Sequence, residues 1–298
     1  ITRNRCHTFK LKMSKGYYHV CSHGLEKNDI FKTQADFIAG MNDVAICIIG
    51  FDVKILCFCL MSNHFHFVLY GTEEECRRFA DIYKHRCAMR MRRHSGEVHG
   101  MKDVEVRIFP VNSQEYLENV IGYVLRNPLA AGIIMMPYHY RWSSVTLYFR
   151  SDQQYSGQFL NQMSARKRFR ILKSRASVPE HYIVDGEGVV LPACYVDFAT
   201  VERIFRHPAR LMAVLARKVE TDVEVAMGIS DTIQMTDQEI KSQLPELLQK
   251  EFGKESISQL SMDQRMKLCL LLKRNFRAGI KQISRITRLD PTVVSKVV

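Results

Sequence analysis

The segment LMSNHFHFVLY at residues 60–70 is the most informative stretch of this 298-residue sequence. From residue 64 onward it alternates, with His64 and His66 on one side and phenylalanines on the other. Because side chains in a β-strand repeat their direction every two residues, both imidazoles would point the same way, with Cα atoms roughly 6–7 Å apart. Two imidazoles at that spacing can share one metal ion. The alternative is a pair of half-exposed strand histidines that bind nothing.

The sequence on both sides of this segment alternates between strand-like and helix-like patterns. A nearly continuous apolar run precedes it, which is typical of a strand covered on both faces. Thr72, followed by three glutamates, is a typical helix start, and Pro128 should end the last helix of the series. The predicted strands cover residues 17–22, 53–60, 64–70 and 104–111, and the predicted helices cover residues 33–49, 72–94 and 113–127.

This order of elements predicts the fold class. Strand, helix, strand, strand, helix, strand is the split βαβ, ferredoxin-like pattern. We therefore expect an α+β domain over residues 1–150, with an antiparallel sheet and helices on one face. The polar and basic residues 151–199 predict a linker with a possible β-hairpin. Residues 200–298 predict a mostly α-helical DNA-binding region that ends in a helix-turn-helix over residues 280–298. Whether the last helix reads DNA bases or packs internally stays open.

The charge of the chain indicates a polyanionic partner. Lysines and arginines number 43 against 31 acidic residues, and the formal net charge is +12. Nucleic acid is the first candidate and an anionic membrane surface the second. Basic residues cluster in three places, and a solvated helix face is the alternative explanation for each cluster. The candidate DNA contacts are Lys84, Arg86, Arg90, Arg92, Arg93, Arg166, Lys167, Arg168, Lys281, Arg285, Arg288 and Lys296.

Cysteine usage and hydropathy favour a cytoplasmic protein. No stretch reaches the roughly 18 uninterrupted apolar residues of a membrane span, and the first residues show no signal-peptide pattern. Nine cysteines lie mostly in apolar segments, without a CxxC pair, so a zinc ribbon is not expected. Buried free thiols in a reducing compartment are the simplest explanation.

A second pair of chemically useful side chains lies in the predicted helix over residues 113–127. Tyr123 and Asn127 are four residues apart and share one helix face. A tyrosine can act as a nucleophile and an asparagine carbonyl can ligate a metal ion. If this face meets the histidine strand, two imidazoles, an amide and a phenol converge in a site suited to phosphoryl transfer. Without that contact, Tyr123 is an ordinary, partly buried core residue.

Three blocks of the sequence, in order, resemble the HUH single-tyrosine transposases. MSNHFHFVL at residues 61–69 is similar to that family's Met-Pro-Asn-His-x-His segment. YVLRNPLAAGI at 123–133, followed by YHYRWSS at 138–144, is similar to its Tyr-Ile-x-x-Asn-Pro-Val-Arg-Ala-Gly and Tyr-x-Trp-Ser-Ser block. Tyr18-His19-Val20 and the stretch from His23 to Phe31 fit its first strand and loop. The closest branch is the REP-associated tyrosine transposases, and the resemblance spans about residues 17–148.

The resemblance implies a ferredoxin-like nuclease domain that cleaves single-stranded DNA with a divalent metal, Mg²⁺ or Mn²⁺. It places His64 and His66 as metal ligands, Asn127 as the third ligand and Tyr123 as the nucleophile. Cleavage in this family leaves a 5′-phosphotyrosine and a free 3′-hydroxyl. The Trp-Ser-Ser segment at 142–144 is interpreted as structural. The expected partner is DNA, as single strands, hairpins or repeat ends, while monomer and homodimer both stay open.

Three positions depart from the family pattern. Ser62 replaces the usual proline, Ala130 replaces an arginine, and His23 replaces an arginine before a glycine. The loss of two cationic positions should weaken or alter DNA contact, but it removes no proposed catalytic atom.

Two other functions compete with strand transfer. The first is a domesticated DNA-binding regulator that keeps the fold without performing strand transfer, which the added helix-turn-helix would suit. The second is a replication initiator or relaxase that shares the His-x-His metal site, which the Asn-Pro and Trp-Ser-Ser blocks disfavour. The intact set of His64, His66, Tyr123 and Asn127 favours the strand transferase.

Overall fold

The computed structural model describes residues 14–22, 25, 28–95, 104–150, 156–228 and 235–298. Its strands are β1 (Gly16–Ser22), β2 (Lys54–Leu60), β3 (Phe65–Gly71), β4 (Val106–Val111), β5 (Gln158–Phe159) and β6 (Ile183–Val184). Its helices are α1 (Gln34–Cys47), α2 (Glu73–Ser95), α3 (Gln114–Ala130), α4 (Ala165–Leu172), α5 (Phe198–Phe205), α6 (Pro208–Ala216), α7 (Glu220–Ala226), α8 (Asp237–Phe252), α9 (Met262–Phe276), α10 (Ile280–Thr287) and α11 (Pro291–Val297).

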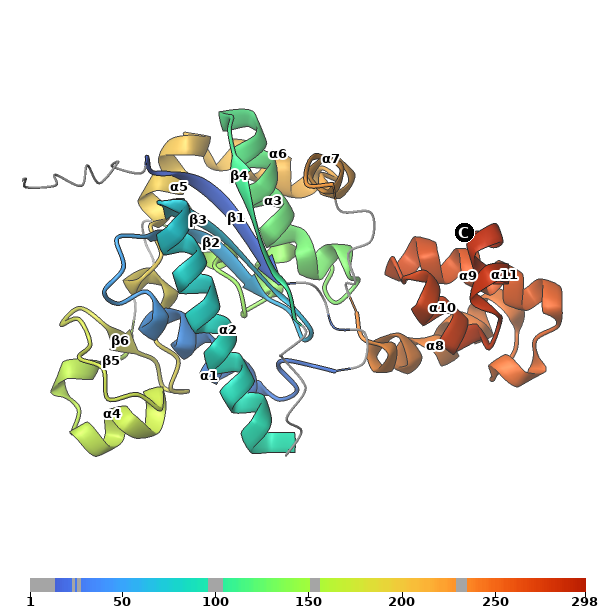
Figure 1. Ribbon diagram of the computed structural model, residues 1–298, viewed down its shortest axis with the longest axis horizontal. Helices are drawn as coiled ribbons and strands as arrows, with labels where there is room; N and C mark the ends of the chain where they lie inside the picture. The colour runs from blue at the N-terminus through green and yellow to red at the C-terminus, as the bar shows by residue number, and fades with distance from the viewer. Residues whose placement is uncertain (1–13, 23–24, 26–27, 96–103, 151–155, 229–234) are drawn as a thin grey trace, which may run out of the picture.

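The first four strands form one antiparallel sheet in the order β2-β3-β1-β4 (Figure 1). The histidine strand β3 is therefore central, between β1 and β2. In its register with β1, His66 lies opposite Cys21 and Val68 lies opposite His19. The α+β class and the order of the first elements are confirmed as predicted. Among the described residues, no helix is long and apolar enough to cross a membrane.

Alternation along β3 divides the protein into two cores. Phe65 and Phe67 point to the face covered by α1 and α2, where the Phe67 ring meets Tyr83 at a centroid distance of 5.1 Å. Val68 points to the opposite face and packs with α3. Two helices therefore share one face, as expected, whereas α3 packs on the other face, against β2 and β3. The reason is that every residue of β2 beyond Lys54 is buried, so both faces of the sheet need cover.

Helix α3 continues past Pro128, contrary to the prediction that this proline ends it. A proline removes one backbone donor but leaves its own carbonyl free to accept. The helix closes its last turn through Ala131, whose N–H donates to the Asn127 carbonyl at 2.9 Å, and Ile133 donates to the Pro128 carbonyl at 2.9 Å. Pro128 therefore lies in the final turn of α3, and Asn127, one residue earlier, keeps its position on the helix.

The free edge of β2 is covered by the Trp-Ser-Ser segment at 142–144. The Leu60 N–H donates to the Trp142 carbonyl at 2.9 Å, and the Ser144 N–H donates to the Phe58 carbonyl at 3.1 Å. The Ser144 hydroxyl also accepts from the Phe58 N–H at 3.0 Å. Because an open strand edge invites pairing with other chains, this segment has the structural role that its sequence indicated.

The outer side of α3 is covered by α5, α6 and α7, which come from beyond residue 197. The last helices, α8–α11, form a lobe apart from the sheet (Figure 1).

The basic stretch around residues 165–172 is helix α4, which packs on α1. After β6, a turn closes where the Gly188 N–H donates to the Asp185 carbonyl at 3.2 Å. The division of the chain at residues 150 and 199 stays a prediction.

The contact between α3 and α6 leaves no room for a side chain at Gly122. A Cβ built there would lie 2.4 Å from Cγ1 of Val214. We expect Gly122→Ala to destabilise the fold by about 1–2 kcal/mol, because overpacking against a stiff β-branched side chain outweighs the higher helix propensity of alanine. In a Val214→Ala background the same change should instead stabilise, by up to about 1 kcal/mol. Urea unfolding of the wild type, Gly122→Ala, Val214→Ala and the double variant measures whether the effect of Gly122→Ala on stability changes sign. A destabilisation of equal size in both backgrounds would contradict the packing argument.

Candidate metal centre

The sheet and α3 bring the four predicted residues together on one buried face. The imidazole centroids of His64 and His66 are 4.9 Å apart, with the rings nearly perpendicular. The Tyr123 ring lies 5.4 Å from the His66 ring, also edge-on. Nε2 of His64 lies 3.4 Å from Oδ1 of Asn127. Each of these four side chains is at most 1% exposed. The helix face that carries the tyrosine therefore meets the histidine strand.

Hydrogen bonds orient His64 so that Nε2 faces the amide of Asn127. The Asn63 side chain donates from Nδ2 to the Leu25 carbonyl at 2.8 Å, which leaves its Oδ1 facing Nδ1 of His64 at 2.7 Å. An amide oxygen only accepts, so Nδ1 of His64 carries the proton and donates. In the neutral ring, Nε2 then presents a lone pair.

Asn127 is oriented in the same way. Its Nδ2 donates to the carbonyl of Tyr123 at 2.9 Å, one turn earlier in α3. Its Oδ1 therefore points at the histidines as an acceptor. Two acceptor atoms, Nε2 of His64 and Oδ1 of Asn127, thus face each other at 3.4 Å with no proton assigned between them. A cation placed between such atoms relieves their repulsion.

His66 adds a third acceptor. Its Nε2 is buried and has no hydrogen-bond partner within the described part of the chain. Burial, and then the neighbouring His64 and His19, hold the pKa of His66 well below its usual range, although the nearby Asn127 side chain acts in the opposite direction. The ring is therefore neutral at physiological pH, which is the form that binds metals. Two imidazole nitrogens and one amide oxygen fit a divalent ion, and such a mixed set admits manganese more readily than magnesium, which prefers oxygen.

His19 and Cys21 on β1 also face this site, although neither was predicted as a site residue. The ligand atoms of His19, Cys21 and His66 all lie within 4.8 Å of one another, so this buried group could also hold a metal ion. The pattern His-Val-Cys in a strand is the signal, because it places both side chains on one face. Burial raises the pKa of the Cys21 thiol to about 12 and lowers the pKa of His19 to about 3. Without a metal, Cys21 is therefore a neutral thiol.

The expected DNA contacts on α2 separate into two groups. Arg90 is 8% exposed and bonds Asp43 of α1 at 2.5 Å, and Arg86 bonds the same carboxylate at 2.6 Å. These two arginines hold α2 on α1, which periodicity could not reveal because Asp43 is distant in sequence. Lys84 is half-buried, whereas Arg92 and Arg93 are exposed.

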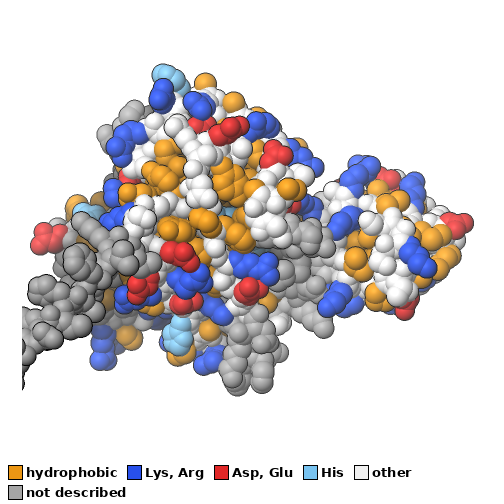
Figure 2. All heavy atoms as spheres, turned by 45° about the horizontal axis from the view of Figure 1, so that its top comes forward, with side chains coloured by type: hydrophobic (Ala, Val, Ile, Leu, Met, Phe, Trp, Pro, Cys, Tyr) orange, Lys and Arg blue, Asp and Glu red, His pale blue; other side chains and the backbone are white. Residues whose placement is uncertain are grey.

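The remaining basic candidates are mostly at the surface. Arg285 pairs with Asp237 at 2.7 Å and so links α10 to α8. On α4, Lys167 donates to Gln158 at 2.9 Å and Arg168 to the Asn161 carbonyl at 3.3 Å. The exposed candidates are Arg166, Lys167, Lys281, Arg288 and Lys296. Figure 2 shows lysines and arginines spread over the face in view and over the α8–α11 lobe, with acidic side chains between them. His23 lies outside the described residues.

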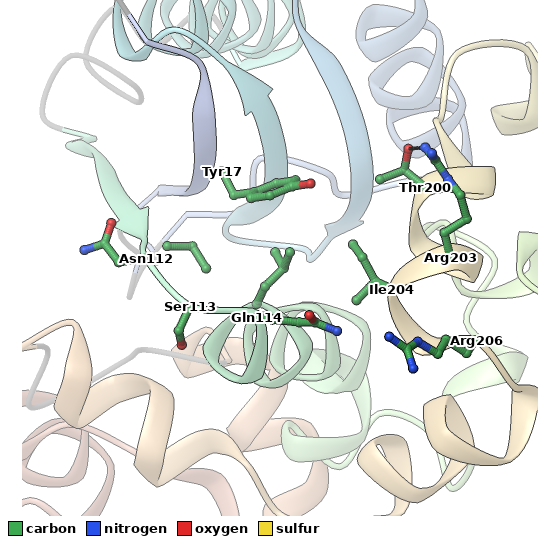
Figure 3. A pocket seen from close by; sticks show the side chains of 10 residues that line it. Tyr17, Asn112, Ser113, Gln114, Thr200, Arg203, Ile204 and Arg206 are labelled. Carbon is green, nitrogen blue, oxygen red and sulfur yellow. Dashed lines mark hydrogen bonds between the residues drawn. The ribbon is translucent and has the colours of Figure 1, made fainter.

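A polar pocket opens where β1, β4, α3 and α5 meet, with a cavity volume of about 440 Å³. In Figure 3 its lining includes Tyr17 from β1, Ser113 and Gln114 from the start of α3, Arg203 from α5 and Arg206, which follows α5. Arg203 donates to the Thr200 hydroxyl at 2.7 Å. Gln114 is nine residues before Tyr123, which corresponds to about 13 Å along the helix. The two arginines were not among the sequence candidates, since their surroundings carry no basic run.

Comparisons with known proteins add little to this geometry. No protein-family model matches the chain, and no curated protein matches it either. Among solved structures, the chain is similar to one described as the REP-associated tyrosine transposase bound to a REP hairpin. The TM-score is 0.36 and the identity 10%, over 53% of this chain and 93% of the other. A similarity of this strength carries no argument about function, so the case rests on the site itself.

Proposed function

We propose that this chain is a metal-dependent DNA strand transferase that cleaves and rejoins single-stranded or hairpin DNA through Tyr123. The observation that carries the proposal is the convergence of three acceptor atoms, from His64, His66 and Asn127, beside a tyrosine ring. A divalent ion, Mg²⁺ or Mn²⁺, would be held by these three side chains. We assign residues 1–150, including helix α3 with Tyr123 and Asn127, to a ferredoxin-like nuclease domain and α10–α11 to a helix-turn-helix, within a cytoplasmic protein.

In the proposed reaction the Tyr123 oxygen forms a bond to phosphorus while the bond from phosphorus to the 3′-oxygen breaks. The phenol gives up its proton and the departing oxygen gains one, which leaves a 5′-phosphotyrosine and a free 3′-hydroxyl. The bound metal would polarise the phosphodiester and stabilise the charge that develops on it. The protein contributes positioning: the Asn127 side chain and the Tyr123 backbone are joined by a hydrogen bond, so nucleophile and ligand stay one helical turn apart.

The burial of the site favours one alternative function. Tyr123 and both histidines are at most 1% exposed, so a DNA strand reaches them only after covering groups move. A domesticated regulator that binds DNA without cutting it would have no need for such movement. A denaturing gel separates the two functions. Labelled single-stranded hairpin DNAs are incubated with the full chain and Mn²⁺, Mg²⁺ or EDTA; a metal-dependent, SDS-resistant band supports the transferase, and DNA binding without any band supports the regulator.

The pocket in Figure 3 is proposed to hold a phosphate of the bound DNA strand. Arg203 and Arg206 supply two positive charges beside the first turn of α3, where free N–H groups favour anions. We expect the double change Arg203→Gln and Arg206→Gln to weaken binding of all single-stranded sequences alike. The slope of log affinity against log salt should become shallower by about 1.4, because each lost phosphate contact removes about 0.7.

The matched control removes two positive charges elsewhere, by Arg77→Gln and Arg78→Gln. These residues lie on α2, which packs on the other face of the sheet. Fluorescence anisotropy at several salt concentrations measures both slopes. Equal slopes in the pocket variant and the control would remove the pocket from the DNA path.

A further inference from the structure

A line of contacts runs from α7 into the candidate metal centre. Sδ of Met227, the residue that follows α7, lies 3.0 Å from Nδ1 of His19. Nε2 of His19 lies 3.1 Å from Nδ1 of His66, and the two rings are stacked with centroids 5.3 Å apart. All three side chains are buried. The contact between Met227 and His19 spans 208 residues of sequence.

The chemistry of the Met227 sulfur determines which ring nitrogens of His19 and His66 carry protons. A thioether sulfur carries no hydrogen and can only accept, so Nδ1 of His19 must carry the proton. His19 is fully buried, and no carboxylate contacts it among the described residues, so its ring is neutral. Its Nε2 therefore accepts, and Nδ1 of His66 must donate. A neutral His66 with its proton on Nδ1 presents a lone pair at Nε2, which is the buried atom without a partner.

We propose that Met227 and His19 are positioning residues that lock His66 in the tautomer able to bind metal through Nε2. The inference deepens the proposed function and rests on it for the identity of the metal site. Metal-binding histidines commonly donate their second N–H to a partner that fixes the ring, and here that partner is another imidazole held in turn by a sulfur. His19 thus acts through His66 and has no need to touch the metal or the DNA.

The helix before Met227 is itself anchored at both ends. Arg126, beside Asn127 in α3, donates from Nε to Glu220 at 3.0 Å, and both side chains are buried. Glu224 is paired with Arg277, which follows α9. Because a buried ion pair has a demanding geometry, these contacts fix the position of α7. Contacts made by residues of the C-terminal half therefore hold the Met227 sulfur beside His19. The geometry of the metal centre thus depends on that half of the chain.

The Cys21 group is the competing arrangement. In that arrangement a soft metal would be bound by His19, Cys21 and His66 together, with the Cys21 thiolate as a ligand. The two arrangements differ in whether the Cys21 sulfur is a ligand. Cobalt distinguishes them, since a thiolate bound to Co²⁺ gives a charge-transfer absorption band and a site without sulfur does not.

The direct test is ¹⁵N NMR of the histidines in the metal-free full chain. We expect His66 to show one tautomer, with Nδ1 protonated and Nε2 bare. Met227→Leu keeps the volume and removes the acceptor, so His19 is released and His66 should populate both tautomers. Mn²⁺ affinity should fall about tenfold in Met227→Leu and about 10–100-fold in His19→Phe. His19→Gln, which returns an acceptor at the Nε2 position, should recover most of the loss.

Phe109→Leu is the matched packing control, because this ring also lies beside His19, at 6.2 Å, without supplying a polar atom. It should leave the tautomer and the Mn²⁺ affinity unchanged. Protonated Nε2 in wild-type His66, an unchanged tautomer in Met227→Leu, or a Co²⁺ charge-transfer band lost in Cys21→Ser would each overturn the inference. If the tautomer is as expected but Mn²⁺ and Mg²⁺ do not bind, the proposed function fails while the lock on His66 stands.

Discussion

Tyr123→Phe is expected to abolish the covalent protein–DNA adduct while DNA affinity stays within about threefold, a change below roughly 0.7 kcal/mol. The substitution removes one oxygen and keeps the ring. That ring makes edge contacts with His19 and His66 at centroid distances of 5.7 and 5.4 Å, so packing is preserved and only the nucleophile is lost. The measurement is a denaturing gel with labelled hairpin DNA, alongside a gel shift under native conditions.

Tyr116→Phe is the matched control for the nucleophile. Tyr116 is seven residues earlier in α3, about two turns away on a similar face, and it is only partly buried. It should keep the wild-type adduct yield. If instead the adduct survives in Tyr123→Phe and disappears in Tyr116→Phe, the nucleophile has been assigned to the wrong turn of the helix.

The second large effect is expected from the metal ligands. His66→Gln and His64→Gln should each weaken Mn²⁺ binding by about 100-fold or more, since loss of a ligand costs at least as much as loss of a partner that orients one. The adduct should vanish in both variants at Mn²⁺ concentrations that saturate the wild type. Glutamine retains most of the buried volume, and circular dichroism verifies that each variant is folded.

His85→Ala is the control for this prediction, because His85 is exposed on α2. It should change neither Mn²⁺ affinity by calorimetry nor adduct yield. Full cleavage in EDTA by the wild-type protein would show that the histidines serve packing alone, and the metal assignment would be withdrawn.

Much of the sheet could be predicted because its elements are defined by local patterns. The alternation from His64 to Leu69 gave the faces of β3 correctly, and the Ser113 cap marks the start of α3. The predicted end of α3 is wrong, because the helix continues through Pro128 to Ala130 despite the one backbone hydrogen bond that a proline cannot donate. The presence of Pro128 indicated that the helix would end nearby, but it did not give the residue at which the helix ends.

The partners of individual side chains could not be predicted. Arg90 carries the same charge as its neighbours in sequence, yet it is buried on Asp43 of another helix. The contact of Met227 with His19 joins residues 208 positions apart. Periodicity reports the face on which a residue lies, and it holds no information about which distant element covers that face. The roles of His64, His66, Asn127 and Tyr123 remain predictions that the geometry supports.

The hydrogen bond from Asn127 to the Tyr123 carbonyl has a consequence for how such a protein would behave in a cell. It ties the tyrosine and one metal ligand into a single helical turn, and that turn lies against the histidine strand of the same polypeptide. One polypeptide therefore brings all four predicted site residues together. On the proposed function, assembling these four side chains would need no residue from a second copy of the chain.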